Sequence, residues 1–354
     1  MSLMVLSAPI TFPNLGISLD PSPVAFTIGG KSIYWYGIII AVGFLLAVIY
    51  ACKRAPQFGL TEDHILDMLL CAVPAAIICA RLYYCIFYWE LYRDNPISIL
   101  YIWEGSLAIY GGVIGAVIAV WIYSRVKKVK LGPMLDIGGL GLLIGQMIGR
   151  WGNFMNREAH GSVTDSFLKM GLTDASGAVT YYHPTFLYES LWNLAGFLLL
   201  HVYSKKRRHY DGEIFTMYVA WYGLGRAWIE GLRTDSLYLF GTGLRVSQLL
   251  AILSCLVAAG LLIYNLYIRP RDPDKMLVRQ VEQRVAEAVA AAESGSVAEP
   301  QKAGGEATEA KPASDTKENS GQSEPQTEAK APGSAERSGT KFDADTSYGT
   351  EQEK

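Results

Sequence analysis

Stretches of roughly 20 residues without a charged side chain recur through the first 270 residues of this chain. Each is long enough to cross a hydrocarbon core about 30 Å thick, because an α-helix rises 1.5 Å per residue. Residues 271–354 differ, with 11 Lys and Arg against 17 Asp and Glu, so the mean hydropathy of the whole chain is only +0.19. An ordinary soluble globular protein is excluded, and we expect an integral membrane protein.

Seven of these stretches are predicted to be transmembrane helices. They cover residues 33–52, 64–89, 107–124, 134–155, 185–204, 214–231 and 246–268. The expected fold class is therefore an all-α integral membrane protein with seven transmembrane helices, a small external head and a disordered cytoplasmic tail. The transmembrane domain is expected at residues 31–268, with the head at residues 157–182.

Basic residues mark one side of the membrane. Lys and Arg follow the first, third, fifth and seventh segments, at residues 53–54, 125–130, 205–208 and 269–275. The connectors on the other side, residues 91–106, 157–184 and 233–245, are longer and richer in Gly, Ser, Thr and Asp. Because short cytoplasmic loops retain Lys and Arg, the N-terminus is expected outside the cell and the C-terminus in the cytoplasm.

Both ends of the chain are expected to lie outside the membrane. Residues 1–30 contain no basic residue, so they lack the first part of a signal peptide and are predicted to be an uncleaved external lead-in. Residues 269–292 are predicted to form a cytoplasmic amphipathic helix, because an apolar residue recurs at every fourth position from Leu277 to Val289. Residues 293–354 are polar and poor in aromatic residues, which predicts a disordered acidic tail.

Ionisable side chains inside the apolar segments are candidates for a functional site, because a charge at the bilayer centre costs roughly 2.5–3.5 kcal/mol. They include Arg81, Asp136, Arg150, Arg226 and Glu230. For Arg81, and for the pair Arg226 and Glu230, the alternative is a contact that only locks helices together. For Asp136 the alternative is a helix cap or a partner on the cytoplasmic side.

The densest polar cluster is the segment GRWGNFMNREAHG, residues 149–161, at the external end of the fourth predicted helix. Arg150 and Asn153 are three residues apart and share a helical face, and Asn156 and Glu158 continue the polar surface. The planar fork of an arginine suits phosphate, and the abundant phosphate at a membrane surface is a lipid headgroup. These residues are candidates for binding a phospholipid.

The sixth predicted helix repeats this pattern. Arg226, Glu230 and Arg233 lie at positions i, i+4 and i+7, on one stripe of the helix. If Glu230 holds Arg226 in place, Arg150 and Arg226 can grip one phosphate from two different helices. His183, at the start of the fifth predicted helix, is a further candidate, although a capping histidine is the more usual explanation.

No cofactor, metal ion or nucleic-acid partner is expected. The five cysteines lie in or beside apolar stretches, with no CxxC pair and no histidine at metal-ligand spacing. Apolar surroundings suppress the reactivity of a thiol, so none of these cysteines is expected to be a nucleophile.

The segment GRWGNFMNREAHG resembles the signature of the prolipoprotein diacylglyceryl transferase family, which comprises bacterial membrane enzymes that lipidate lipoprotein precursors. Other segments agree with this family in order and spacing across residues 31–268. They are residues 35–37, 80–82, 110–115, 183–189, 225–226, 247–248, and the positions of Glu230 and Arg233. The resemblance does not cover the lead-in or the tail.

The resemblance implies a seven-helix body with an external head, in the bacterial cytoplasmic membrane. The implied reaction moves the diacylglyceryl group of phosphatidylglycerol to the thiol of the lipobox cysteine in a prolipoprotein signal peptide. A thioether forms and glycerol phosphate is released, which is the first step of lipoprotein maturation. The implied partners are phosphatidylglycerol, prolipoprotein signal peptides and the membrane.

The resemblance also implies site residues. Positions important in the family are matched by Tyr36, Asp136, Arg150, Asn153, Asn156, Glu158, Gly161, Arg226 and Glu230, with Arg150 and Arg226 as the phosphate-binding pair. Many relatives carry a histidine, a candidate for deprotonating the acceptor thiol, where this chain has Tyr110. Near neutral pH a phenol is a poorer base than an imidazole, so the resemblance leaves the base open between Tyr110, His183 and other groups.

Three other functions compete with this interpretation. A secondary transporter usually shows internal repeats with interrupted helices in matching positions, and the sequence shows no such repeat. A transferase that uses CDP-alcohols requires an aspartate-rich metal cluster, which the sequence lacks. A purely structural scaffold leaves the polar cluster around Arg150 unexplained.

Overall fold

The computed structural model describes residues 9–102, 105–174, 176–234, 245–269 and 272–295. All seven segments predicted as transmembrane helices are helical. They form α1 (Trp35–Arg54), α2 (Glu62–Phe87), α3 (Ile109–Val126), α4 (Leu131–Met155), α5 (Thr185–Lys206), α6 (Glu213–Ile229) and α7 (Val246–Ile263), and a π-helical turn, η7 (Tyr264–Ile268), continues α7.

Five of the seven helices are long and apolar enough to cross a membrane. They are α1 with the short helix η2 (Ala55–Phe58), α2, α3, α4, and α7 with η7. Large apolar side chains on these helices are exposed, among them Leu70 at 73%, Ile86 at 71% and Ile109 at 81%. Such surfaces suit contact with lipid, so the chain is a mostly helical membrane protein. The other two helices do not meet the same criteria, since α6 has only 17 residues and α5 carries several polar residues among its apolar ones.

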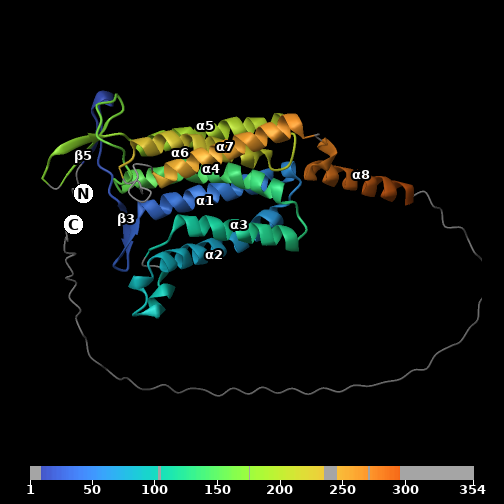
Figure 1. Cartoon of the computed structure of the whole chain (residues 1–354), viewed down its shortest axis with the longest axis horizontal. Helices are drawn as coiled ribbons and strands as arrows, with labels where there is room; N and C mark the ends of the chain where they lie inside the picture. The colour runs from blue at the N-terminus through green and yellow to red at the C-terminus, as the bar shows by residue number, and fades with distance from the viewer. Residues whose placement is uncertain (1–8, 103–104, 175, 235–244, 270–271, 296–354) are drawn as a thin grey trace, which may run out of the picture. The chain divides into compact units, whose positions relative to one another are not determined.

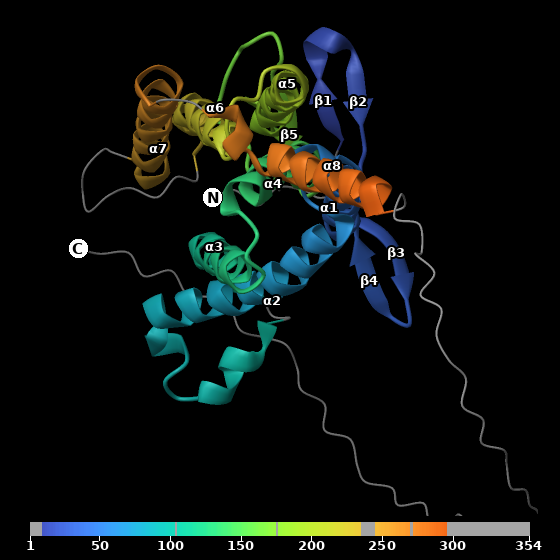
Figure 2. The same cartoon turned by 90° about the vertical axis from the view of Figure 1, so that its right-hand side faces the viewer.

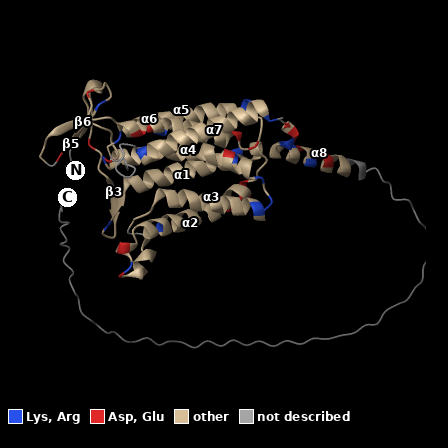
Figure 3. Ribbon diagram, in the orientation of Figure 1, with Lys and Arg blue, Asp and Glu red and all other residues tan. Residues whose placement is uncertain are grey.

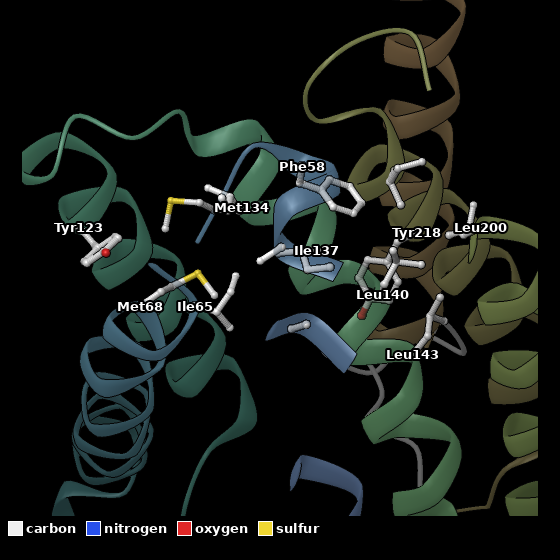
Figure 4. Close-up of a cluster of buried hydrophobic side chains, with 14 residues drawn as sticks. Phe58, Ile65, Met68, Tyr123, Met134, Ile137, Leu140, Leu143, Leu200 and Tyr218 are labelled. Carbon is white, nitrogen blue, oxygen red and sulfur yellow. The ribbon is translucent and has the colours of Figure 1, made fainter. Parts of the chain in front are cut away.

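Helix α4 packs against three neighbours, α1, α5 and α6 (Figures 1 and 2). Its first half supplies much of a buried apolar cluster (Figure 4). The fully buried members of this cluster are Ala55, Phe58, Ile65, Met134, Ile137, Leu140, Leu143 and Ile214. The apolar first half of α4 therefore fixes this helix among its neighbours, and its second half carries the polar side chains described below.

Helices α2 and α3 form a hairpin of their own, because they pack mainly against each other. Glycine permits this contact: a methyl group on Gly115 would lie 2.6 Å from the carbonyl oxygen of Ala75.

Thr61 begins α2 with a capping box, in which its side chain accepts from the backbone N–H of His64.

A small β-sheet lies at one end of the helices and was not among the sequence-based expectations (Figure 1). Its strand order is β2-β1-β5-β6, formed by β1 (Ile10–Phe12), β2 (Ile17–Leu19), β5 (Met170–Thr173) and β6 (Val179–Tyr182). Thr11 of β1 pairs with Gly171 of β5, so one sheet joins strands from the predicted lead-in and from the predicted head. A separate hairpin, β3 (Val24–Ile28) with β4 (Lys31–Tyr34), leads into α1.

Apolar side chains fix this sheet to the ends of two helices. Ile10, Met170 and Leu172 are buried on the sheet, and they form one cluster with Phe154 of α4 and Phe186 of α5. This packing brings the end of α4 beside the beginning of α5.

The last described element is α8 (Leu277–Gly295), in the segment where the sequence predicts an amphipathic helix. Its start is tied to the connector between α5 and α6, since the Leu277 backbone N–H donates to Asp211 Oδ2 at 2.8 Å. The predicted disordered tail lies, from residue 296 onward, outside the described residues.

Candidate active site

Three arginines from separate parts of the sequence converge on the carboxylate of Glu189, in the second turn of α5. Arg150 Nη2 lies 2.5 Å from Glu189 Oε2, and Arg226 Nη1 lies 3.2 Å from Oε1. Arg233, after α6, reaches the same Oε1 at 3.5 Å. The side chain of Glu189 is only 5% exposed, so a single buried carboxylate connects α4, α5 and the end of α6.

Glu230 contributes a second buried carboxylate. It lies one turn after Arg226, in the short helix η6 (Glu230–Leu232), and its Oε2 is 2.5 Å from Arg226 Nη2. The predicted pairing of these two residues is therefore present, although Arg226 contacts Glu189 as well. Two buried carboxylates, Glu189 and Glu230, thus pair with the arginines at this end of α5 and α6.

A hydrogen-bonded chain extends from Arg150 towards the head. Arg150 Nη1 donates to Asn153 Oδ1 at 3.2 Å, and Asn153 Nδ2 donates to Glu158 Oε1 at 2.9 Å. Asn156 Nδ2 lies 3.4 Å from the same Glu158 oxygen. The structure thus joins Arg150, Asn153, Asn156 and Glu158 of the sequence cluster. The side chains of Arg150 and Arg226 remain 24% and 18% exposed, so neither is fully buried.

Two glycines allow close approach around this group. A methyl group on Gly152 would lie 2.8 Å from Cδ2 of Tyr36, so the Tyr36 ring packs directly on α4 beside Asn153. A methyl group on Gly161 would lie 2.6 Å from Cβ of His183. Gly161 N–H donates to the His183 carbonyl at 2.9 Å, which holds the end of the cluster against the start of α5.

His183 lies in this loop contact, outside the helices. Its Nδ1 is 3.4 Å from the hydroxyl of Tyr188, and its backbone N–H donates to the Ser162 carbonyl at 3.1 Å. Burial lowers the pKa of the His183 imidazole below its usual range, which favours the neutral ring. A neutral imidazole can accept a proton.

Asp136 is not brought to this group. It lies 14 residues before Arg150 on α4, about 21 Å away along the helix axis. Its carboxylate is fully buried and accepts from the backbone N–H groups of Gly212 and Phe215, both at 2.9 Å. Asp136 therefore caps the beginning of α6, which is the alternative that the sequence left open.

Arg81 and Tyr110 lie on the α2–α3 hairpin. Arg81 is buried and donates to four backbone carbonyls of the α2–α3 connector, at 2.8 to 3.2 Å, so it holds that connector in shape. Tyr110 is 42% exposed in the first turn of α3. Within the described residues, no hydrogen bond or ion pair joins Tyr110 to the arginines.

Sequence reasoning missed Glu189 as a site residue. It stands inside the fifth apolar segment, so the rule that selected Arg81 and Arg150 also selects it. The described residues contain no group of three or more His, Cys, Asp and Glu placed to hold a metal ion, because these buried carboxylates pair with arginines instead.

Comparison with known proteins identifies the same family that the segment at residues 149–161 resembles. Residues 23–264 match the family model described as prolipoprotein diacylglyceryl transferase. The chain belongs to this family. Among curated relatives, the phosphatidylglycerol–prolipoprotein diacylglyceryl transferase of Lysinibacillus sphaericus is 45% identical over 256 residues, covering 70% of this chain and 93% of the relative. The enzymes of the same name from Bacillus licheniformis and Listeria monocytogenes are each 46% identical, covering 70% and 71% of this chain and 94% and 92% of the relatives.

The matched region of this transferase family contains every residue of the group described above. It begins in the hairpin before α1 and ends in the π-helical turn after α7, so β1, β2 and α8 lie outside it.

Proposed function

We propose that this chain transfers the diacylglyceryl group of phosphatidylglycerol to the thiol of a lipobox cysteine in a prolipoprotein signal peptide. The convergence of Arg150 and Arg226 on one carboxylate, in a member of this family, is the observation that carries the proposal. Two guanidinium groups that contact the same carboxylate are close enough to contact one phosphate.

Phosphate is a better partner than a carboxylate for two arginine forks. It offers more oxygens, and charge-assisted hydrogen bonds to arginine are frequently bidentate. In this account the lipid phosphate takes over contacts of Arg150 and Arg226 with Glu189, while Glu230 keeps its bond to Arg226. Asn153 and Asn156 offer amides to the glycerol hydroxyls.

The proposed chemistry is a direct displacement. The sulfur of the acceptor cysteine attacks the glycerol carbon that bears the phosphodiester, so a C–S bond forms and a C–O bond breaks. The electron pair of the C–O bond leaves with the phosphate oxygen, and glycerol phosphate departs. Arg150 and Arg226 stabilise the charge that develops on this oxygen. The thiol proton goes to a base, for which neutral His183, Tyr110 and Tyr36 are the candidates.

The nucleophile belongs to the substrate. The five cysteines of this chain lie on α1, α2 and α7, and all are free thiols. Since the lipid and the signal peptide are both held in the membrane, bringing them together at the arginine group supplies much of the rate enhancement through proximity.

The proposed placement has seven spans in the bacterial cytoplasmic membrane, with the arginine group at the external end. Basic residues support it, because Figure 3 shows Lys and Arg at the ends of α3 and α5 that lie away from the strands. Such residues are retained on the cytoplasmic side. Helices α5 and α6 then cross with their polar residues facing α4.

The test uses purified protein, phosphatidylglycerol and a lipobox peptide, with the thioether product measured by mass spectrometry. Arg150→Gln keeps hydrogen-bonding capacity but removes the charge, and we expect near-complete loss of product. The control is Arg93→Gln, a 59%-exposed arginine outside the group, which should retain activity. Unchanged transfer by a correctly folded Arg150→Gln protein would refute the phosphate role.

A further inference from the structure

A second group of basic residues surrounds a pocket at the opposite ends of the helices. The pocket has a volume of about 610 Å³ and lies between the end of α5, the connector to α6 and the π-helical turn η7. Pockets of roughly 300–1,000 Å³ are typical of small-molecule sites. None of the residues assigned to the transfer reaction lines it.

One wall of this pocket is strongly basic. Lys206 and Arg207 are exposed, and neither forms an ion pair with any described residue. Arg208 is different, since its side chain is only 6% exposed. Its nearest carboxylate oxygens, on Asp136 and Asp211, are 3.9 and 3.8 Å away, and its buried Nη1 makes no hydrogen bond. The Arg208 guanidinium also lies 4.5 Å from the centre of the Phe58 ring, so it is turned towards the core. Two exposed cations, Lys206 and Arg207, thus line a pocket whose lining, within the described part of the chain, contains no acidic residue.

The rest of this wall is held in place by hydrogen bonds. Tyr203 and His209 both line the pocket, and both are fixed by the fully buried Glu213. The Tyr203 hydroxyl donates to Glu213 Oε1 at 2.6 Å, and the His209 backbone N–H donates to Oε2 at 2.5 Å. Glu213 therefore fixes two residues of the wall from behind and does not itself line the pocket.

The opposite wall is apolar and aromatic. Leu266 and Tyr267 come from η7, and the Tyr267 side chain is 82% exposed. π-Helical turns are rare and frequently occur at functional sites. This turn ends an apolar helix long enough to span the bilayer, so its side chains lie at the depth where phospholipid headgroups meet their acyl chains.

We infer that this pocket binds the phosphate of an anionic phospholipid, in the leaflet opposite the reacting one. Cationic side chains beside an apolar wall match a phosphate attached to glycerol and acyl chains, and basic pockets between helices are known to hold anionic headgroups. Retention of Lys and Arg in cytoplasmic loops explains a basic connector, but it does not explain why Lys206 and Arg207 line one pocket together with Leu266 and Tyr267. Lys206 is 17 residues from Glu189 on α5, about 26 Å along the helix, so the two sites are separate.

This inference uses the proposed membrane placement but not the transfer reaction. The test reconstitutes the full chain in phosphatidylcholine nanodiscs that contain a photo-crosslinkable phosphatidic acid, and it maps the labelled peptides. We expect label on the peptide containing Leu266 and Tyr267. Since each basic residue near the surface contributes about 1 kcal/mol to binding an anionic lipid, Lys206→Gln/Arg207→Gln should weaken this labelling roughly thirtyfold.

A matched control is available at the same end of the molecule. Lys53→Gln/Lys128→Gln removes two exposed charges outside the pocket lining and should leave the labelling unchanged. Both double variants must be monodisperse and have the unfolding temperature of the unmodified chain. If labelling then falls equally in the two variants, surface charge has only a general effect, and the inference is overturned.

Two further arms identify the source of the phosphate. Inorganic phosphate in excess should not displace the crosslinked lipid, and a phosphatidylcholine probe should not label the pocket. Displacement by inorganic phosphate would overturn the lipid assignment in favour of free phosphate. Labelling should persist in Arg150→Gln/Arg226→Gln, which separates a failure of this inference from a failure of the proposed transfer.

Discussion

At the scale of single residues, Glu189 explains how arginines of α4, of α6 and of the segment after α6 lie close together. Its carboxylate pairs with Arg150, Arg226 and Arg233, whereas Glu230 pairs with Arg226. Burying charged groups is costly unless each one is paired, and removing one partner leaves that cost uncompensated. In the proposed mechanism, Glu189 positions the arginines in the absence of lipid and gives way to a phosphate when lipid binds.

Glu189→Gln tests this role, because the amide has the same shape but no charge. We expect it to destabilise the fold by about 3–5 kcal/mol, the range for breaking a buried ion pair, and to abolish most transfer. Glu189→Asp keeps the charge and should recover part of both properties. Thermal unfolding in detergent and product formation are the measurements. An unfolding temperature for Glu189→Gln equal to that of the unmodified chain would contradict the role.

We expect His183 to make the stability of the fold depend on pH. Burial lowers its folded-state pKa, so the unfolded chain binds a proton at a higher pH than the folded chain does. Above the unfolded-state pKa of about 6.5 the ring is neutral in both states, so His183 does not change the free energy of unfolding. As the pH falls below that value, the unfolded state binds the proton more readily, so the free energy of unfolding decreases. Unfolding temperatures between about pH 5 and 8 should show this slope, and His183→Gln should flatten it. An unchanged slope in the variant would assign it to another group.

At the scale of secondary-structure elements, a reciprocal pair of tryptophans fixes α5 against α6. Trp192 Nε1 donates to the Trp221 carbonyl and Trp221 Nε1 donates to the Trp192 carbonyl, both at 3.0 Å, and the two rings stack at 4.5 Å. Each indole lies over a glycine of the other helix, Gly225 and Gly196. Gly225 directly precedes Arg226, so this lock also positions one of the two phosphate-binding arginines.

Gly225→Ala places a methyl group against the Trp192 indole. We expect a loss of about 1–3 kcal/mol from overpacking, together with a lower rate of transfer. The matched control is Gly138→Ala on α4, where no atom lies within 4 Å of the added methyl group. That control should be neutral or stabilising, since alanine favours a helix over glycine by up to about 1 kcal/mol. Equal stability of the two variants would show that the lock does not matter.

Asp136 is predicted to act on a helix rather than on the substrate. Its carboxylate caps the beginning of α6, and loss of a cap costs about 0.5–2 kcal/mol. Asp136→Ala should lower the unfolding temperature, and Asp136→Asn should restore only part of it, because its single amide oxygen can accept from Gly212 or from Phe215 but not from both. In the folded fraction the apparent KM for phosphatidylglycerol should be unchanged. A raised KM in a stable Asp136→Asn protein would instead favour a part in substrate binding.

At the scale of the whole molecule, the site consists of residues that are far apart in the sequence. The helices could be predicted, because the length and charge of each apolar segment are local properties. The sheet could not, because strands of three and four residues from β1 and β5 pair across more than 150 positions. The same applies to the role of Glu189: its presence in an apolar segment is visible in the sequence, but its three partners depend on how α4, α5 and α6 pack.

The proposed mechanism depends on binding of the phosphate of phosphatidylglycerol by Arg150 and Arg226. An experimental structure of the full chain with this lipid bound would test this binding. We expect phosphate oxygens within hydrogen-bond distance of both guanidinium groups, with Glu189 released from at least one of them. A lipid phosphate bound elsewhere, with Arg150 and Arg226 still paired to Glu189, would contradict it.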